Sequence, residues 1–269
     1  MPNSVHHYQT SQLDNLEVLY VPEGQRGFPQ HFHPTYCLSL VLRGAEQTEL
    51  ADRSLLALPG SLSVTHPDEV HTNPLPEHCS QSFVTLYISE DVMQRANGGA
   101  RAWFGQPIIQ DTPLFAEFER LVRASLPGPT LRSLRVDEPR FFSLLQRLVQ
   151  HATSGNPADL LRKSWFTSLD ALIDERLHRK LSLDEMAQQM GLSKFKFARL
   201  FKEARGISPA HYLVVKRIER AKTMLRQGIP LADTALQVGF YDQAHFSRAF
   251  QGIAGVTPGQ YLSSCKILQ

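Results

Sequence analysis

Two stretches near the C-terminal end of this sequence are copies of one another, and this repeat constrains the fold more than any other feature. Each copy carries a glycine, then a Phe-x-Arg-x-Phe run, then Gly-x-Ser/Thr-Pro, and finally Tyr-Leu. The offset between the copies is 48 residues up to the first glycine and 49 from the first phenylalanine onward. A duplicated unit of this length predicts that one supersecondary structure occurs twice. The copies comprise 187–193, 197–201, 206–209 and 212–213, and then 235–241, 246–250, 255–258 and 261–262.

The first copy predicts a short helix that begins at a capping box. Ser182 and Glu185 have the spacing at which a hydroxyl and a carboxylate each accept from the other residue's backbone N–H. Apolar residues then recur at i, i+3, i+4 and i+7, and Gly191 stands where such a helix should end, because glycine adopts the left-handed conformation without steric cost. The stripe consists of Leu183, Met186, Ala187 and Met190.

A second helix is predicted directly after this turn, with Ser193 as its cap and Gly206 at its end. Two short helices joined by a glycine turn are typical of the helix-turn-helix. At about 100° per residue, one face of the second helix is apolar and the opposite face is basic with one aromatic residue. The apolar face carries Phe197, Leu200, Phe201 and Ala204, and the outward face carries Phe195, Arg199 and Lys202, flanked by Lys196 and Ala198.

The outward residues of both copies suit the reading of base edges. An aromatic edge can contact a thymine methyl group, and a guanidinium can bind guanine or a phosphate. A solvated basic face is the alternative, but Arg199 and Arg248 occupy equivalent outward positions, which favours a shared role. Asp242 is interpreted as the N-cap of the second helix rather than as a base contact. The outward residues of the second copy are Gln243, Ala244, His245, Ser247 and Arg248.

The two copies are separated by a predicted helix from Pro209 to about Gln227. Eighteen residues at 1.5 Å each span ~27 Å, and successive major grooves on one side of B-DNA are ~34 Å apart. The helix is therefore long enough to hold two recognition helices in adjacent grooves. Its basic residues are candidates for phosphate contacts or for a solvated face: Lys216, Arg217, Arg220 and Lys222.

From about Trp165 onward the sequence resembles the DNA-binding domain of the AraC/XylS family of bacterial transcription regulators. Its most specific element is the run G-F-x-D-Q-x-x-F-S-R-x-F, which begins at Gly239. The resemblance implies that outward residues of both recognition helices contact bases. Carried over by position, these are Phe195, Ala198 and Arg199, and then Gln243, Ala244, His245, Ser247 and Arg248.

Length and charge predict a two-domain protein whose C-terminal domain binds DNA. The 269 residues exceed the usual size of one domain. Residues 165–269 contain 15 basic and 9 acidic residues, a net charge of +6, whereas residues 1–164 contain 13 and 17, a net charge of −4. The three cysteines favour a reducing compartment, and no apolar segment is long enough for a membrane span, so a cytoplasmic protein is expected.

The N-terminal half predicts short β-strands broken by turns, as in a sandwich or barrel. The order His31-x-His33, Gly44, Pro59-Gly60 and His71 resembles a cupin-type sensor domain. The expected organisation is a cupin-like effector-binding barrel at 1–90, a helical linker at 91–157, and the DNA-binding domain at 165–269. The helices of the linker are candidates either for a dimer contact or for packing against the barrel. A hinge is expected at 154–157. The predicted effector contacts are His31, His33, Tyr36 and His71.

A metal is the alternative occupant of the histidine site, because metal-binding cupins place ligands at such positions. Their pattern also has a glutamate shortly after the second histidine, where this chain has Tyr36, Cys37 and Leu38. Cys37 would complete a set that favours zinc or a soft metal. An organic effector is preferred here, and no metal or other cofactor is expected.

The predicted function is sequence-specific regulation of transcription, as an activator without enzymatic activity. The expected partners are double-stranded promoter DNA, RNA polymerase, a small-molecule effector and a second copy of the chain. Two alternatives stay open: a metal-dependent cupin enzyme fused to a DNA-binding module, and an effector-independent regulator whose barrel serves only for dimerisation.

Overall fold

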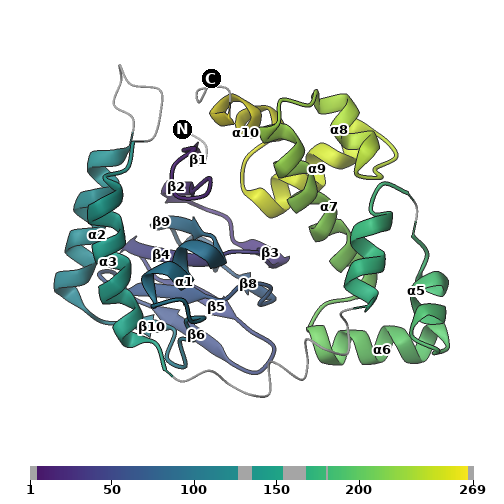
Figure 1. Ribbon diagram of the computed structural model, residues 1–269, viewed down its shortest axis with the longest axis horizontal. Helices are drawn as coiled ribbons and strands as arrows, with labels where there is room; N and C mark the ends of the chain where they lie inside the picture. Colours follow the sequence, from purple (N-terminus) through teal and green to yellow (C-terminus); the bar gives the residue numbers. More distant parts are fainter. Residues whose placement is uncertain (1–4, 127–134, 154–167, 180, 266–269) are drawn as a thin grey trace. The chain divides into compact units, whose positions relative to one another are not determined.

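The structure is a computed structural model that describes residues 5–126, 135–153, 168–179 and 181–265. The chain forms two compact units, Met1–Gly155 with Ser263–Gln269 and Asn156–Leu262. Figure 1 shows that the first unit is rich in strands and the second is helical, which confirms the predicted fold class. The predicted hinge at 154–157 lies outside the described residues.

The N-terminal unit contains two antiparallel sheets. The larger has the order β1-β2-β9-β4-β7-β10 and the smaller has the order β3-β8-β5-β6. Among the described strands the two sheets do not join into one hydrogen-bonded ring, so the arrangement is a cupin-like sandwich. The strands are β1 (His6–Gln9), β2 (Glu17–Gly24), β3 (Phe28–His31), β4 (Tyr36–Arg43), β5 (Glu46–Glu49), β6 (Ser54–Ala57), β7 (Leu62–Thr65), β8 (His71–Asn73), β9 (Gln81–Ile88) and β10 (Ile108–Ile109).

Strand β4 shows how the larger sheet divides an apolar core from a polar interior. Tyr36, Leu38 and Leu40 belong to the hydrophobic core, whereas Cys37 and Ser39 line a cavity between the sheets. Successive side chains of a strand point to opposite faces, so this two-residue period follows directly from the sequence. The core includes side chains of three helices that lie beside the larger sheet in Figure 1: α1 (Glu90–Ala96), α2 (Thr112–Ser125) and α3 (Glu138–Leu148).

The C-terminal unit has the predicted helix-turn-helix pair on each side of a long helix. Ser182 and Glu185 form the expected capping box, and Ser208 caps the helix that begins at Pro209. Ser193 occupies the N-cap position, but its side chain makes no capping hydrogen bond, contrary to expectation. After a helical segment at 168–176, the helices are α5 (Leu183–Gln189), α6 (Lys194–Arg205), α7 (Pro209–Arg226), α8 (Leu231–Gln237), α9 (Gln243–Ala254) and α10 (Pro258–Cys265).

The two turn glycines differ in how closely they are packed, and this predicts unequal effects of alanine. Both have positive φ, +63° at Gly191 and +84° at Gly239. A Cβ at Gly191 would meet nothing within 4 Å, whereas one at Gly239 would lie 2.8 Å from the carbonyl oxygen of Leu177. We expect Gly191→Ala to cost about 1–2 kcal/mol of unfolding free energy and Gly239→Ala about 1–3 kcal/mol more. Thermal unfolding of the two variants tests this, and equal losses would contradict the packing difference.

Candidate DNA-reading helices and ligand cavity

Helix α6 buries the phenylalanines of the repeat and exposes a different one. Phe197 and Phe201 are each 1% exposed and their ring centroids lie 5.5 Å apart, whereas Phe195 is 80% exposed. A single exposed apolar side chain is common on protein surfaces, so Phe195 is a candidate contact because of its position beside exposed basic side chains on this helix, not because of its exposure alone. Lys196, Arg199 and Lys202 are also exposed, and Ala198 is half-buried.

Helix α9 repeats this arrangement with different outward side chains. Phe246 and Phe250 are fully buried, with ring centroids 5.6 Å apart. Asp242 accepts a hydrogen bond of 2.6 Å from the backbone N–H of His245, which confirms its capping role. The outward set begins in the first turn of the helix, where Gln243, Ala244 and His245 are exposed. Further along, Arg248 is exposed and Ser247 is half-buried.

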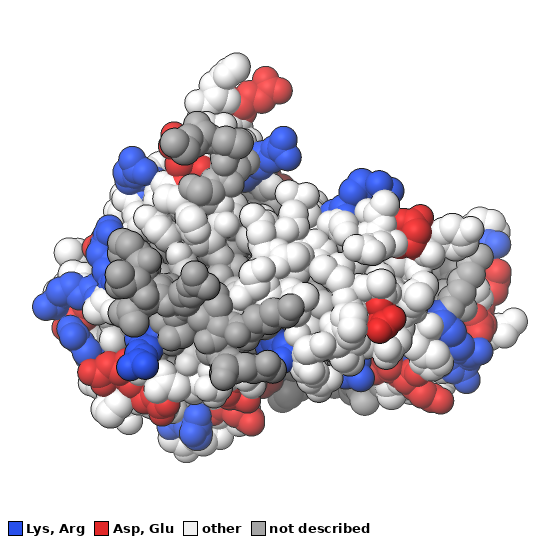
Figure 2. Space-filling model, turned by 90° about the horizontal axis from the view of Figure 1, so that it is seen from above, with Lys and Arg blue, Asp and Glu red and all other residues white. Residues whose placement is uncertain are grey.

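An acidic residue accompanies the outward arginine of α6. On the face of the molecule shown in Figure 2, Lys and Arg lie close to Asp and Glu and do not form one broad basic patch. Arg199 lies 3.9 Å from Glu203 one turn along α6, with both side chains exposed, and such a pair contributes little because water screens it. In the described part of the chain Arg248 makes no ion pair. Arg199 therefore has a weak acidic partner on its own helix, and Arg248 has none among the described residues.

Most of the basic residues of α7 are engaged inside the C-terminal unit. Lys216 lies 2.7 Å from Asp174, and Lys222 is buried beside Glu219 at 2.9 Å. Arg217 donates a hydrogen bond to the backbone carbonyl of Arg179, and burial lowers the pKa of the Arg217 guanidinium. Of the four residues considered for phosphate contacts, only Arg220 is exposed.

Tyr241 is a candidate contact that sequence reasoning missed. It is 90% exposed and directly precedes Asp242, so it lies at the N-terminal end of α9 beside Gln243. The sequence contained a signal for this position, since the one residue by which the second copy exceeds the first lies in the turn that contains Tyr241. A large exposed ring at the entry to a recognition helix belongs to the same surface as the outward residues of α9.

The N-terminal unit holds a polar cavity between its two sheets. Its volume is about 30 Å³, and three of its lining residues are His31, His33 and His71. Each of these histidines is buried, and their candidate ligand nitrogens all lie within 4.8 Å of one another. The cluster forms because β3 pairs with β8 and places His31 opposite His71, while His33 follows two residues later. The cavity has room for about one water molecule or ion.

Hydrogen bonds fix the orientation of two of the three imidazoles. His31 Nδ1 lies 2.7 Å from the carbonyl oxygen of Pro29, and His71 Nδ1 lies 2.8 Å from that of Glu69. A carbonyl oxygen only accepts, so Nδ1 carries the hydrogen in each ring and Nε2 is the basic nitrogen. Burial and then the neighbouring His33 lower the pKa of His71 to about 4, which keeps this ring neutral at pH 7.

A buried carboxylate shares this cavity. Glu46 is 7% exposed and lines it from β5, and no described residue makes a hydrogen bond to its Oε2. Burial raises the pKa of Glu46 to about 7, and the hydroxyl of Ser39 offsets part of this shift. Cys37 also lines the cavity, but it is not part of the three-histidine cluster.

The prediction that Tyr36 lines the same cavity requires correction. Its side chain is fully buried in the core on the other face of β4, and its hydroxyl donates to the carbonyl of Ala102 at 2.7 Å. The alternation of side chains along β4 puts Cys37 and Ser39 toward the cavity instead.

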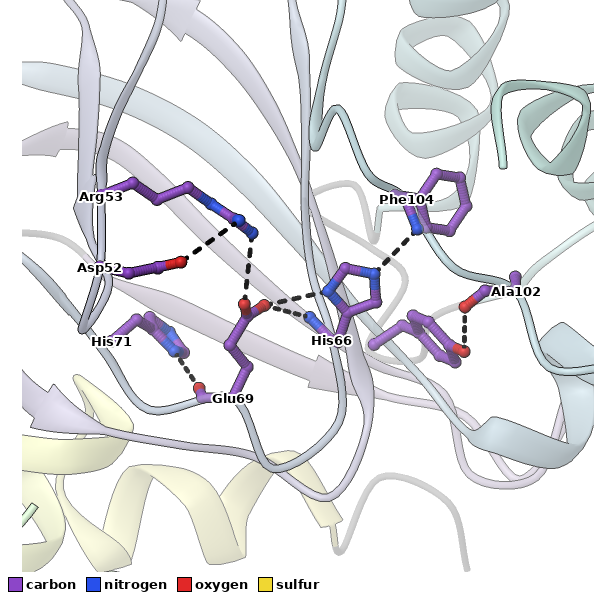
Figure 3. Close-up of polar contacts among 8 residues, drawn as sticks. Asp52, Arg53, His66, Glu69, His71, Ala102 and Phe104 are labelled. Atoms are coloured by element: carbon purple, nitrogen blue, oxygen red, sulfur yellow. Dashed lines mark hydrogen bonds and ion pairs between the residues drawn. The ribbon is translucent and has the colours of Figure 1, made fainter. Parts of the chain in front are cut away.

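A series of contacts leads from His71, which lines the cavity, to Phe104 (Figure 3). The carbonyl of Glu69 accepts from His71, and the carboxylate of Glu69 lies 3.0 Å from Nδ1 of His66. Nε2 of His66 accepts from the N–H of Phe104 at 2.9 Å, and the His66 ring stacks on Trp103 at 4.1 Å.

Trp103 extends these contacts to the start of the interdomain segment. Its carbonyl accepts from the N–H of Thr153 at 2.7 Å. Residues 154–167 follow Thr153 in the sequence and lead to the C-terminal unit. Hydrogen bonds, a ring stack and the peptide link between Trp103 and Phe104 therefore connect His71 to Thr153.

A second cavity, of about 170 Å³, lies between the larger sheet and α2. Its walls include Leu40, Leu42, Val84 and Val122, together with Glu119 and Arg123. Aliphatic walls of this kind suit an apolar group rather than an ion. The two cavities lie on opposite faces of the larger sheet, so they are separate sites.

Comparison with known proteins identifies the family of this chain. A model of the AraC-like ligand binding domain matches residues 15–169, and a model of a helix-turn-helix domain matches residues 186–264. The chain belongs to the AraC family of transcription regulators. It is 26% identical to the uncharacterized HTH-type transcriptional regulator YbfI of Bacillus subtilis, over 88% of this chain and 89% of the relative. It is 24% identical to the arabinose operon regulatory protein of Escherichia coli, over 86% and 81%.

Solved structures support the two-domain fold of this AraC family member. An apo variant of ToxT from Vibrio cholerae aligns over 97% of both chains with a TM-score of 0.57 and 12% identity. ToxT bound to an unsaturated fatty acid aligns over 97% of this chain and 95% of that one, with a TM-score of 0.53 and 14% identity. Among the described residues of the present chain, no helix has the length and apolar character needed to cross a membrane.

Proposed function

We propose that this AraC family regulator activates transcription by placing α6 and α9 in adjacent major grooves of a promoter and recruiting RNA polymerase there. The observation that supports this proposal is the division of each of these two helices into a buried phenylalanine face and an exposed face of basic, polar and aromatic side chains. The exposed sets differ, with Phe195 and Arg199 on α6 and Gln243, His245 and Arg248 on α9. Each monomer therefore reads two unlike sequences.

Control by a small ligand is the second part of the proposal. The AraC-like ligand binding domain contains a cavity lined by His31, His33 and His71, and hydrogen bonds and ring contacts connect His71 to Thr153. A ligand that prefers one arrangement of these contacts shifts the population of DNA-binding conformations. Such a regulator acts in the cytoplasm, as a homodimer, and catalyses no reaction.

Footprinting combined with transcription in vitro tests this proposal. Purified protein is expected to protect promoter DNA over two adjacent grooves per monomer and to raise transcript yield from that promoter with purified RNA polymerase. Protection with reduced transcript would make the protein a repressor. No sequence-specific protection on any promoter of the source genome would sink the proposal.

The location of the ligand is tested by two matched sets of variants. His33→Ala and His71→Ala alter the polar cavity, and Val122→Trp fills the apolar one, since Val122 is 6% exposed and lines it. The proposal predicts that ligand-dependent DNA binding is lost in the histidine variants and kept in Val122→Trp. The opposite result would place the effector beneath α2, and turnover of the ligand would favour the enzyme alternative.

A further inference from the structure

The polar cavity has the chemistry of a cation site, and we propose that His31, His33 and His71 bind a divalent transition-metal ion of the zinc class. This inference names the ligand of the cavity that the proposed function uses, and it depends on that function only for the effect on DNA. The first observation behind it is convergence: three buried histidines have ligand nitrogens within 4.8 Å of one another.

The orientation of the rings supplies the second observation. Because Nδ1 of His31 and of His71 donates to a backbone carbonyl, the nitrogen able to bind a metal is Nε2 in both rings. Metal-binding histidines are usually held this way, by a carbonyl or carboxylate that accepts from the other ring nitrogen. The β3–β8 pairing that sets His31 opposite His71 holds two of the ligands on adjacent strands.

Size and charge decide between a cation and an anionic ligand. A cavity of about 30 Å³ has room for an ion and is too small for an organic acid. The carboxylate of Glu46, whose Oε2 has no hydrogen bond from the described residues, would repel an anion and is stabilised by a nearby dication. Glu46 is therefore the group to complete the site, as a fourth ligand or through a metal-bound water.

The donor set selects the class of metal. Three imidazole nitrogens suit zinc, cobalt, nickel or copper, whereas calcium and magnesium require oxygen ligands. In a tetrahedral zinc site with bonds of about 2.1 Å, neighbouring ligand nitrogens lie about 3.4 Å apart. Metal binding therefore requires the ligand nitrogens to move closer together by about 1 Å or a little more.

Titration of the full chain tests the site directly. The protein is stripped of metal with a chelator and dialysed. It is then titrated with Zn²⁺ by calorimetry and with Co²⁺ by visible absorption spectroscopy, because the absorption bands of bound Co²⁺ depend on the number and geometry of its ligands. We expect one equivalent of either metal to bind. His33→Gln and His71→Gln should weaken binding by about 100-fold or more, and Glu46→Gln by about 10–100-fold with a changed Co²⁺ spectrum.

His78→Asn is the matched control, because His78 is exposed and asparagine tolerates its φ of 64°. It should bind metal like the wild type. Circular dichroism of the metal-free variants should match the wild type, which separates loss of a ligand from loss of the fold. If the wild type binds no metal, or if folded histidine variants bind it unchanged, the site is overturned.

Footprinting with and without Zn²⁺ separates this inference from the proposed function. Promoter binding by a chain that takes up no metal overturns the metal site and leaves the regulator standing. If the chain binds one equivalent of metal in a histidine-dependent way but protects no promoter, the metal site is supported and the proposed function is refuted. A change of at least about tenfold in promoter affinity on adding Zn²⁺, lost in His71→Gln, supports both.

Discussion

Phe197→Ala is expected to destabilise the C-terminal unit by about 3–5 kcal/mol, whereas Phe195→Ala should change its stability by less than about 0.5 kcal/mol. The two residues are two positions apart on α6. Phe197 is 1% exposed and packs against Phe201, while Phe195 is 80% exposed. Removing the buried ring leaves a cavity among aromatic neighbours, and removing the exposed ring leaves none.

Amide hydrogen exchange measures this difference in stability, because it reports on the C-terminal unit separately from the N-terminal unit. Amides of α6 and α7 that exchange by unfolding of the C-terminal unit should speed up by about 10²–10⁴-fold in Phe197→Ala and stay near the wild-type rate in Phe195→Ala. Phe195→Ala should instead lose affinity for promoter DNA. If Phe195→Ala destabilised the unit as much as Phe197→Ala, the assignment of a buried and a reading face to α6 would be wrong.

Arg248→Ala is expected to weaken binding to the specific promoter by about 1–3 kcal/mol, roughly 5- to 150-fold, with little change on random DNA. Arg248 is exposed on the outward face of α9 and makes no ion pair among the described residues. Competition binding at fixed salt gives both affinities. An equal loss on specific and random DNA, with a shallower salt dependence, would make Arg248 a phosphate contact instead.

Arg199→Ala should show a smaller loss, because Arg199 gives up its contact with Glu203 when it binds DNA. Glu203→Ala is the matched variant, since it removes the partner and keeps the arginine. Its promoter affinity should equal or exceed that of the wild type. A loss of affinity in Glu203→Ala would show that the pair orients Arg199 for its contact.

The C-terminal helices could be predicted closely because their signals are local. Ser182, Gly191, Gly206 and Pro209 mark helix ends within a few residues of the chain, and the repeat gives the glycine and proline signals twice. Ser193 shows the limit of this reasoning, since it holds the N-cap position without a side-chain bond. The engagement of the basic residues of α7 could not be predicted for another reason: Lys216 pairs with Asp174, a contact between segments that no local pattern reveals.

The N-terminal site was predicted only in part, because strand pairing joins residues that are distant in sequence. His31 and His33 are suggested by their spacing, but the position of His71 beside them depends on the β3–β8 register. The pairing register of a strand also decides which of its faces is buried in the core. In β4 the face that carries Tyr36 packs into the hydrophobic core and not toward the cavity. Glu46 was missed because a strand with acidic residues is usually exposed to solvent. Here the side chain of Glu46 is buried and lines the polar cavity.

The central claim is that the two copies of the repeat share a scaffold and read different bases. Selection of binding sites from random DNA, with the wild type and two double variants, tests it most directly. Phe195→Ala/Arg199→Ala should relax base preference at one cluster of positions, and Gln243→Ala/Arg248→Ala at another about one helical turn away. Loss of preference at the same positions in both variants, or a uniform loss of affinity with unchanged preference, would contradict the claim.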